Sequence, residues 1–88
     1  MVTLFTGLFL ENLRSINDLD LKSRVSEAII SIENSETIYE LSNLKKMKGH
    51  SETYRIKIGS YILGFFFDGQ NVKLACFVKR EKINDLFL

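Results

Sequence analysis

The first half of the chain carries apolar residues at the spacing of two amphipathic helices. A short apolar stretch at residues 2–5 predicts a strand, and the first helical pattern then covers residues 8–16. The second pattern begins near Asp20, a suitable N-cap, and ends at residues 33–35. Its apolar stripe consists of Leu21, Val25, Ala28, Ile29 and Ile32. The short break between the patterns predicts a helical hairpin in which each helix buries one face.

The second half alternates between apolar and polar residues, which predicts three strands. Residues 53–58, 61–67 and 71–79 form these strands, and the middle one is apolar on both sides, as is typical of a central strand. Residues 59–60 predict a tight turn, and the Asp-Gly-Gln-Asn segment at 68–71 predicts a hairpin. In the first of the three strands, Tyr54, Ile56 and Ile58 oppose Arg55 and Lys57. In the last, Val72, Leu74, Cys76 and Val78 oppose Lys73, Ala75, Phe77 and Lys79.

These patterns predict a single domain over residues 1–88 of the α+β class. The expected order is β-α-α-β-β-β, in two layers, with an antiparallel sheet whose one face carries the N-terminal helical hairpin. The first strand joins this sheet at an edge. Residues 36–51 read as an irregular connection, anchored by Leu41, Leu44 and Met47. Arg55 and Lys57 are then expected on the face that the helices leave open.

Composition adds a charge asymmetry to this picture. Residues 1–40 carry three basic and seven acidic side chains, and residues 41–88 carry nine basic and four acidic ones. A basic half indicates a surface that meets polyanions. The lone Cys76 cannot form an intramolecular disulfide, which fits a reducing cytoplasm. No apolar run approaches the roughly 20 residues of a membrane span, and the N-terminus lacks the basic region of a signal peptide.

The residue types exclude several kinds of chemistry. One histidine, His50, and one cysteine offer no ligand pair for a metal, so neither a metal nor another cofactor is expected. Cys76 is interpreted as a buried structural cysteine and His50 as a solvated loop residue. What remains is a basic set, which is either a phosphate-binding surface or a solvated outer face. Its members are Lys45, Lys46, Lys48, Arg55, Lys57, Lys79, Arg80 and Lys82.

The order of the motifs resembles the RelE/ParE superfamily of bacterial toxins, and its RelE branch most closely. The resemblance covers essentially the whole chain and is carried by NLKKMKG, by YRIKIGSY, by the strand before DGQNV and by the late VKRE. It implies the toxin of a type II toxin–antitoxin pair, a metal-free endoribonuclease that cuts mRNA on the ribosome. The implied catalytic residues are Arg55, Lys57 and Arg80, and the implied RNA- and ribosome-binding residues are Lys45, Lys46, Lys48, Lys79 and Lys82.

Two departures from the family pattern concern catalysis. Where the family commonly has G-x-Y-R, this chain has Gly59-Ser60-Tyr61-Ile62, so the arginine expected at position 62 is absent. RelE-type enzymes also place a tyrosine close to the position of Leu86, and neither Leu86 nor Phe87 can exchange a proton. The resemblance therefore implies a phosphate-binding surface with reduced catalytic power.

Two other functions fit the same resemblance. A ParE-like inhibitor of DNA gyrase would share the fold without being a nuclease, and the missing arginine favours it, while the retained basic residues argue against it. A chain that only titrates antitoxin would have a purely structural basic face. All of these interpretations imply a cognate antitoxin as partner, and the nuclease also implies the ribosome and mRNA in the cytoplasm, with no membrane or small-molecule cofactor.

Overall fold

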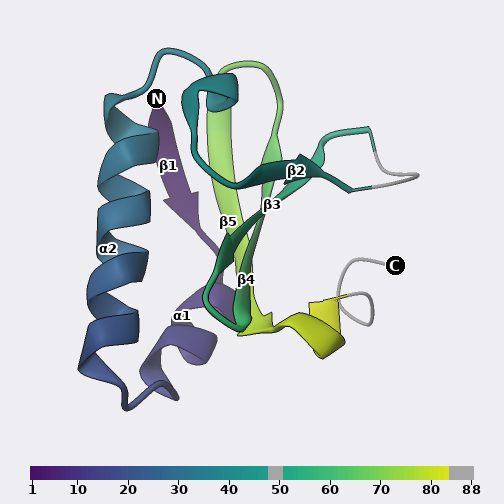
Figure 1. Ribbon diagram of the computed structural model, residues 1–88. Helices are drawn as coiled ribbons and strands as arrows, with labels where there is room; N and C mark the ends of the chain where they lie inside the picture. The colour runs from purple at the N-terminus through teal and green to yellow at the C-terminus, as the bar shows by residue number, and fades with distance from the viewer. Residues whose placement is uncertain (48–50, 84–88) are drawn as a thin grey trace.

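The computed structural model describes residues 1–47 and 51–83 of the chain. Over these residues two helices and five strands follow one another (Figure 1) as β1 (Val2–Phe5), α1 (Gly7–Arg14), α2 (Leu19–Asn34), β2 (Leu44–Lys46), β3 (Thr53–Ile58), β4 (Tyr61–Phe67) and β5 (Asn71–Lys79). Two single-turn 3₁₀ helices, η1 (Ile38–Glu40) and η2 (Arg80–Lys82), precede β2 and follow β5. No helix in the described part of the chain is long and apolar enough to cross a membrane.

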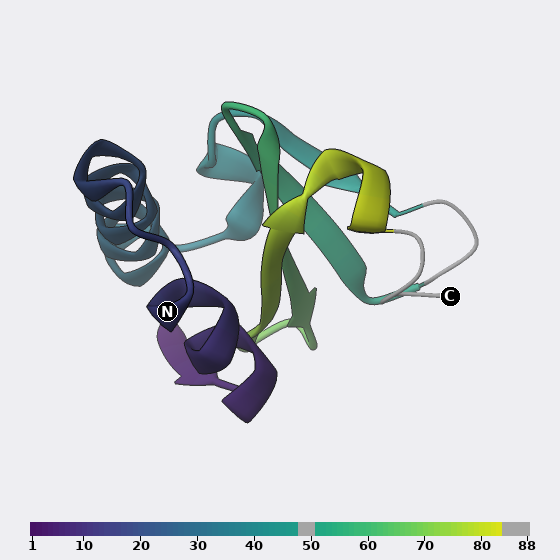
Figure 2. The same cartoon turned by 90° about the horizontal axis from the view of Figure 1, so that it is seen from below.

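The strands form one mixed sheet in the order β1-β5-β4-β3-β2. β1 lies at an edge, as predicted, but it pairs in parallel with β5, so the expected fully antiparallel sheet is wrong at this edge; the other neighbours are antiparallel. Seen from below, both helices lie on one side of the sheet and η2 on the other (Figure 2). The predicted α+β class, the two layers and the central position of β4 are therefore confirmed.

β2 is the element that the expected order lacks. It lies within residues 36–51, which had been interpreted as an irregular connection, and has only three residues. Three residues are too few to show the alternation of apolar and polar side chains that predicts a strand. β2 forms because it pairs with β3, in the register Leu44↔Ile56 and Lys46↔Tyr54. The prediction that this segment is irregular is therefore wrong at β2 and at η1.

Side-chain caps fix where the helices begin. Asp18, rather than the expected Asp20, is the N-cap of α2, because its Oδ1 accepts the Leu21 N–H at 3.2 Å. Thr6 caps α1 by accepting the Phe9 N–H at 3.1 Å, and its hydroxyl also donates to the Ala75 carbonyl of β5 at 3.0 Å. Thr6 thus ties the start of α1 to the sheet.

The main core fills the space between the helices and the sheet. The sheet contributes Tyr54, Ile56, Ile58, Leu63, Phe65, Val72, Leu74 and Phe77, and the helical layer contributes Phe9, Ile16, Leu21, Val25, Ile32 and Ile38. The predicted stripe of α2 is confirmed, with Ala28 and Ile29 partly buried at its margin. Because the alternate residues Tyr54, Ile56 and Ile58 of β3 point into this core, Arg55 and Lys57 project from the opposite, open face.

A β-bulge changes which side chains of β5 reach that open face. Gly64 pairs with Cys76 and Phe65 with Leu74, so Ala75 is an extra residue in β5. The predicted alternation is therefore wrong after Leu74, since an inserted residue inverts the faces of all that follow. Phe77 turns toward the helices and stacks on Tyr61, with ring centroids 5.0 Å apart. A second, small apolar cluster results on the other face, made of Met47, Ile62, Ala75, Cys76 and Ile83, with Val78 packed against it.

Both predicted turns of the meander are confirmed. Gly59 (φ 63°) and Gly69 (φ 98°) adopt the left-handed conformation that a side chain would strain. At the second turn Asp68 Oδ1 accepts the N–H groups of Asn71 at 2.7 Å and of Gln70 at 2.9 Å. These two bonds lower the pKa of the Asp68 carboxyl below its ordinary value.

Candidate functional site

A basic hollow of about 270 Å³ opens on the face of the sheet away from the helices. Its lining residues come from β2, β3, β4 and the start of η2, and they are Asn43, Leu44, Lys45, Arg55, Lys57, Ile62 and Arg80. Segments far apart in the sequence therefore contribute four cations to one concave surface. We call this surface the basic hollow.

The cations of β2 and β3 face each other across the strand pair. Lys45 is the direct cross-strand partner of Arg55, and Lys57 lies two residues further along the same face of β3. Arg55 is half-buried, while Lys45 and Lys57 are exposed. Like charges placed directly opposite each other destabilise a sheet, and an anion bound between them would remove that penalty. The arrangement is the one expected of a phosphate site.

Arg80 reaches the basic hollow because the chain turns sharply after β5. Its backbone N–H donates to the Ser60 carbonyl of the β3–β4 turn at 3.0 Å. Three residues later Ile83 is 2% exposed and packs into the small apolar cluster on the open face. This hydrogen bond and this buried side chain hold η2 against the sheet, so the Arg80 backbone is fixed at the rim.

Ile62 forms an apolar part of the lining of the hollow. It lies on β4 between its ladder partners Lys57 and Val78 and is only 2% exposed. Its neighbours in the small apolar cluster include Cys76 and Ile83. The position at which the family places an arginine therefore lines the hollow, but here it carries a buried hydrocarbon side chain that offers no hydrogen-bond donor.

Not every basic residue singled out in the sequence reaches this surface. Lys46 pairs with Tyr54 and Lys79 with Tyr61, and both tyrosines belong to the helix-facing core. Lys82 is exposed on η2. None of these three lines the basic hollow. Lys48, which was also predicted to bind RNA, lies outside the described residues, as do His50, Leu86 and Phe87.

Cys76 is a structural residue, as predicted. It is a free thiol that is 1% exposed, and burial raises the pKa of this thiol to about 11. A protonated, covered sulfur cannot act as a nucleophile near neutral pH. Among residues 1–47 and 51–83, no group of three or more His, Cys, Asp or Glu side chains gathers as a metal site would.

Asn43 is a lining residue that sequence reasoning missed. Its φ of 62° lies in the left-handed region, which asparagine tolerates better than most residues. Asn43 directly precedes Leu44, the first residue of β2. The only feature of the sequence that could have indicated its position is that an asparagine, a residue common in turns, directly precedes the Leu-Lys-Lys segment at 44–46.

The whole chain is similar to known toxins. No protein-family model matches the chain. It is 28% identical over 88 residues to Toxin RelE3 of Methanocaldococcus jannaschii, covering 99% of both chains. The RelB–RelE antitoxin–toxin complex from Methanococcus jannaschii contains a chain that matches with a TM-score of 0.80 and 28% identity, over 97% of this chain and 99% of that one.

Two further solved structures share the fold at lower identity. A chain of the YoeB dimer from Staphylococcus aureus matches with a TM-score of 0.72 and 18% identity, over 90% of this chain and 94% of that one. A chain of the RelBE2 toxin–antitoxin complex from Mycobacterium tuberculosis gives a TM-score of 0.60 and 18% identity, over 90% and 96%. Full-length similarity in sequence and in fold confirms the resemblance carried by the motifs. Along its full length the chain is therefore similar to toxins of the RelE type.

Proposed function

We propose that the chain is a ribosome-associated mRNA endoribonuclease that works without a metal ion, and that Ile62 reduces its activity. The observation that carries the proposal is the convergence of Lys45, Arg55, Lys57 and Arg80 on one hollow. Such a cluster binds the phosphodiester backbone of RNA in any sequence. Full-length similarity to RelE-type toxins supports the choice of mRNA on the ribosome as substrate.

The reaction is an internal displacement at phosphorus. The 2′-oxygen of one nucleotide forms a bond to the adjacent phosphorus, and the bond from phosphorus to the 5′-oxygen of the next nucleotide breaks. The proton of the 2′-hydroxyl passes to a base, and the departing 5′-oxygen gains a proton. Negative charge builds on the pentacovalent phosphorus, so cations fixed around it lower the barrier, and in-line geometry must be imposed on the chain.

The lining residues divide this work by their chemistry. Guanidinium groups stay charged and hold phosphate oxygens in a planar fork, which suits Arg55 in its half-buried position and Arg80 at the rim. An amine can exchange a proton, which an arginine does not. We therefore assign proton transfer to Lys57, which lines the hollow beside the Ile62 position.

Ile62 removes one donor from this arrangement. Loss of one preorganised donor in a charge-stabilising site lowers a rate by about 100- to 1,000-fold. The hollow keeps its four cations, so binding of RNA is affected less than the chemical step. The protein is thus proposed to be a toxin that binds its RNA substrate but cleaves it slowly.

A cognate antitoxin is the expected partner of the neutralised toxin, the ribosome and mRNA are the expected partners of the free toxin, and both forms are expected in the cytoplasm. Two of the structural relatives were solved as toxin–antitoxin complexes, which supports this partner. We expect the antitoxin to place acidic residues against the basic hollow, so its association with the toxin should weaken as salt increases.

Cleavage of mRNA in a purified translation system tests the proposed function. The wild-type protein should cut reporter mRNA only when ribosomes are present, and Arg55→Ala, Lys57→Ala and Arg80→Ala should each lower the rate at least tenfold. Lys73→Ala is the matched control, because Lys73 is an exposed lysine of β5 outside the hollow. Inhibition of gyrase supercoiling without mRNA cleavage would instead identify the ParE-like alternative.

A further inference from the structure

A second hollow of about 240 Å³ adjoins the basic hollow, between α2 and the outer edge of β3. Asn43 and Lys57 line both hollows and form the wall between them. The two hollows connect at this point because the pairing of β2 with β3 stops at Leu44 and Ile56. The rest of β3, after Ile56, therefore has no strand beside it on this edge. A chain bound in the basic hollow can therefore continue over Lys57 toward α2.

We propose that this second hollow binds the nucleobase next to the cleaved phosphodiester, and selects bases that carry an exocyclic amino group. The inference rests on the proposed nuclease function and adds a specificity site to it. We call the second hollow the base pocket. The family's phosphate-binding residues do not account for it, since apart from the shared wall its lining comes from α2, from the segment before β2 and from the helix-facing side of β3.

The floor of the base pocket is apolar and matches the flat face of a base. Ile56 and Ile58 are buried in β3, and Ala28 and Leu41 are partly buried beside them. Apolar and aliphatic surfaces pack against the π-face of any base and give affinity without selectivity. A phosphate would gain nothing from such a floor, because its oxygens require donors.

The rim of the base pocket carries both signs of charge. Glu27 lines it from α2, on the same helix as Arg24. A carboxylate repels a second phosphate but accepts hydrogen bonds from the amino groups of adenine, cytosine and guanine. Uracil carries no exocyclic amino group and offers only the N3–H between two carbonyl oxygens, which the carboxylate would repel. Glu27 is therefore the residue that would discriminate among bases.

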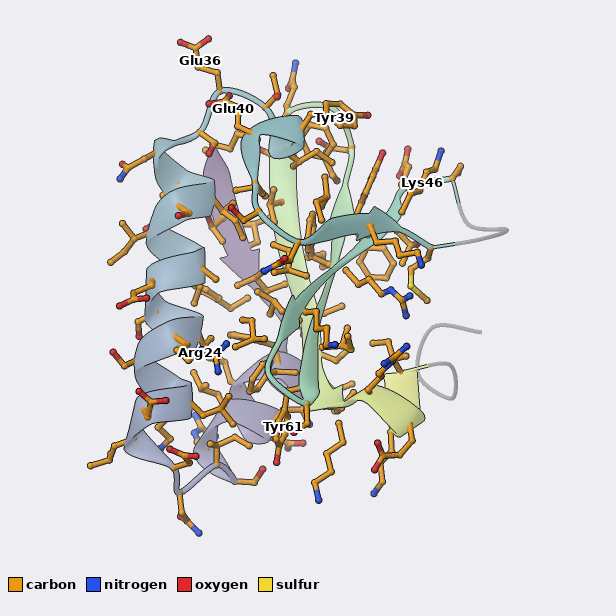
Figure 3. The ribbon with its side chains drawn as sticks, viewed as in Figure 1. Arg24, Glu36, Tyr39, Glu40, Lys46 and Tyr61 are labelled. Carbon is orange, nitrogen blue, oxygen red and sulfur yellow. The ribbon has the colours of Figure 1, made fainter. Side chains whose placement is uncertain are left out.

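Arg24 has a defined place at the mouth of this pocket. Its side chain reaches from α2 toward the sheet (Figure 3), and a Cβ built on Gly59 would lie only 3.2 Å from its Nη1. The guanidinium thus packs against the β3–β4 turn, where Gly59 has no side chain. A planar cation held there can stack on a base or bind its carbonyl oxygen.

The charges of the two hollows together favour a nucleic acid over an apolar peptide. Among the described residues that line them, five are cations, Arg24, Lys45, Arg55, Lys57 and Arg80, and one is a carboxylate, Glu27. An apolar side chain from a protein partner would leave the rim groups without hydrogen-bond partners. A nucleotide satisfies the cations with its phosphate and the carboxylate with its base.

The test measures cleavage of reporter mRNAs that differ only in the bases flanking one cleaved phosphodiester. In the wild-type protein, uracil at one flanking position should lower the cleavage rate about tenfold relative to adenine, cytosine or guanine. Glu27→Gln supplies a donor as well as an acceptor and should reduce this discrimination to about twofold or less. Arg24→Ala should lower the rate for all four bases. Glu33→Gln, on the same helix but outside the pocket, should retain the wild-type preference.

The outcomes separate this inference from the proposed function. Cleavage that depends on Arg55 and Lys57 but shows an unchanged base preference in Glu27→Gln would overturn the base pocket and leave the nuclease intact. A Glu27→Gln variant that cleaves like the wild type but binds antitoxin more weakly would assign the pocket to a protein partner, and would also overturn the inference. Absence of ribosome-dependent cleavage in the wild type would overturn both.

Discussion

Lys57 and Ile62 are direct cross-strand partners next to the β3–β4 turn, and both line the basic hollow. Lys57 is exposed to solvent, whereas Ile62 is 2% exposed and belongs to the apolar cluster beneath. A lysine side chain therefore lies beside a hydrocarbon side chain at the position where the family pattern has an arginine. This pair summarises the proposed site, in which binding groups are present and one catalytic donor is missing.

An anion bound between Lys45 and Arg55 should offset the repulsion between these two cations and so stabilise the folded protein. We expect millimolar pyrophosphate, at constant ionic strength, to raise the melting temperature of the wild-type protein by a few degrees, because a ligand that binds only the folded state stabilises it. Arg55→Ala should lose most of this shift, and Lys73→Ala should keep it. An equal shift in all three proteins would show that the anion acts elsewhere.

Asn12 hydrogen-bonds β5 beyond the last residue of β5 that pairs with β1. Its Oδ1 accepts the Phe77 N–H at 3.0 Å, from a position on α1. Asn12→Ala should lower the free energy of unfolding by about 1–3 kcal/mol, since the donor lies in a partly buried place and is left unpaired. Denaturant unfolding measures the change, and Asn17→Ala, an exposed neighbour, should shift it by less than about 0.5 kcal/mol.

The covered thiol of Cys76 should react slowly and should make stability depend on alkaline pH. Burial raises its pKa to about 11 from an ordinary value of 9.0, so the unfolded chain loses this proton first as the pH rises. Its contribution to stability is therefore fully present below pH 9 and is lost progressively between about 9 and 11. Cys76→Ala should show a smaller alkaline loss of unfolding free energy than the wild type.

Chemical modification checks the same thiol independently. A thiol-specific reagent at neutral pH should label the unfolded protein at once and the folded protein only at the rate of opening, because the sulfur is 1% exposed. Rapid labelling of the folded protein would contradict the buried, structural role assigned to Cys76.

Periodicity predicted most of the fold because long amphipathic patterns leave few alternatives. The stripe of α2 and the alternation of β3 both dictate which residues face the core, and this placed Arg55 and Lys57 on the open face before the structure was known. The grouping of Arg80 with them followed from the expected strand pairing, and the family resemblance implied the same grouping. The structure shows the hydrogen bond from the Arg80 backbone to Ser60 that holds it there.

The features that could not be predicted depend on contacts between distant residues. β2 is a strand only because β3 lies beside it, and the bulge at Ala75 exists where Thr6 binds the Ala75 carbonyl. The central position of β4 predicted that Ile62 is buried, but its contact with Cys76 could not be predicted, because the bulge turns Cys76 onto the open face. The base pocket likewise combines α2 with the edge of β3, which no local pattern reveals.

Replacing Ile62 by arginine tests the central claim most directly. The new side chain starts from a buried position but can extend into the hollow, so we expect a loss of about 1–3 kcal/mol in unfolding free energy from the desolvated stem and charge. Ile62→Met is the matched control, because it keeps an apolar side chain of similar volume and costs less than about 1.5 kcal/mol. Both variants are first shown to fold by circular dichroism.

The decisive measurement is the rate of ribosome-dependent mRNA cleavage by folded Ile62→Arg. The account predicts an increase of about 100- to 1,000-fold over the wild type, with Ile62→Met at the wild-type rate. If Ile62→Arg instead cleaves mRNA no faster than Ile62→Met, the claim that the basic hollow is an RNA-cleaving site weakened at position 62 is contradicted.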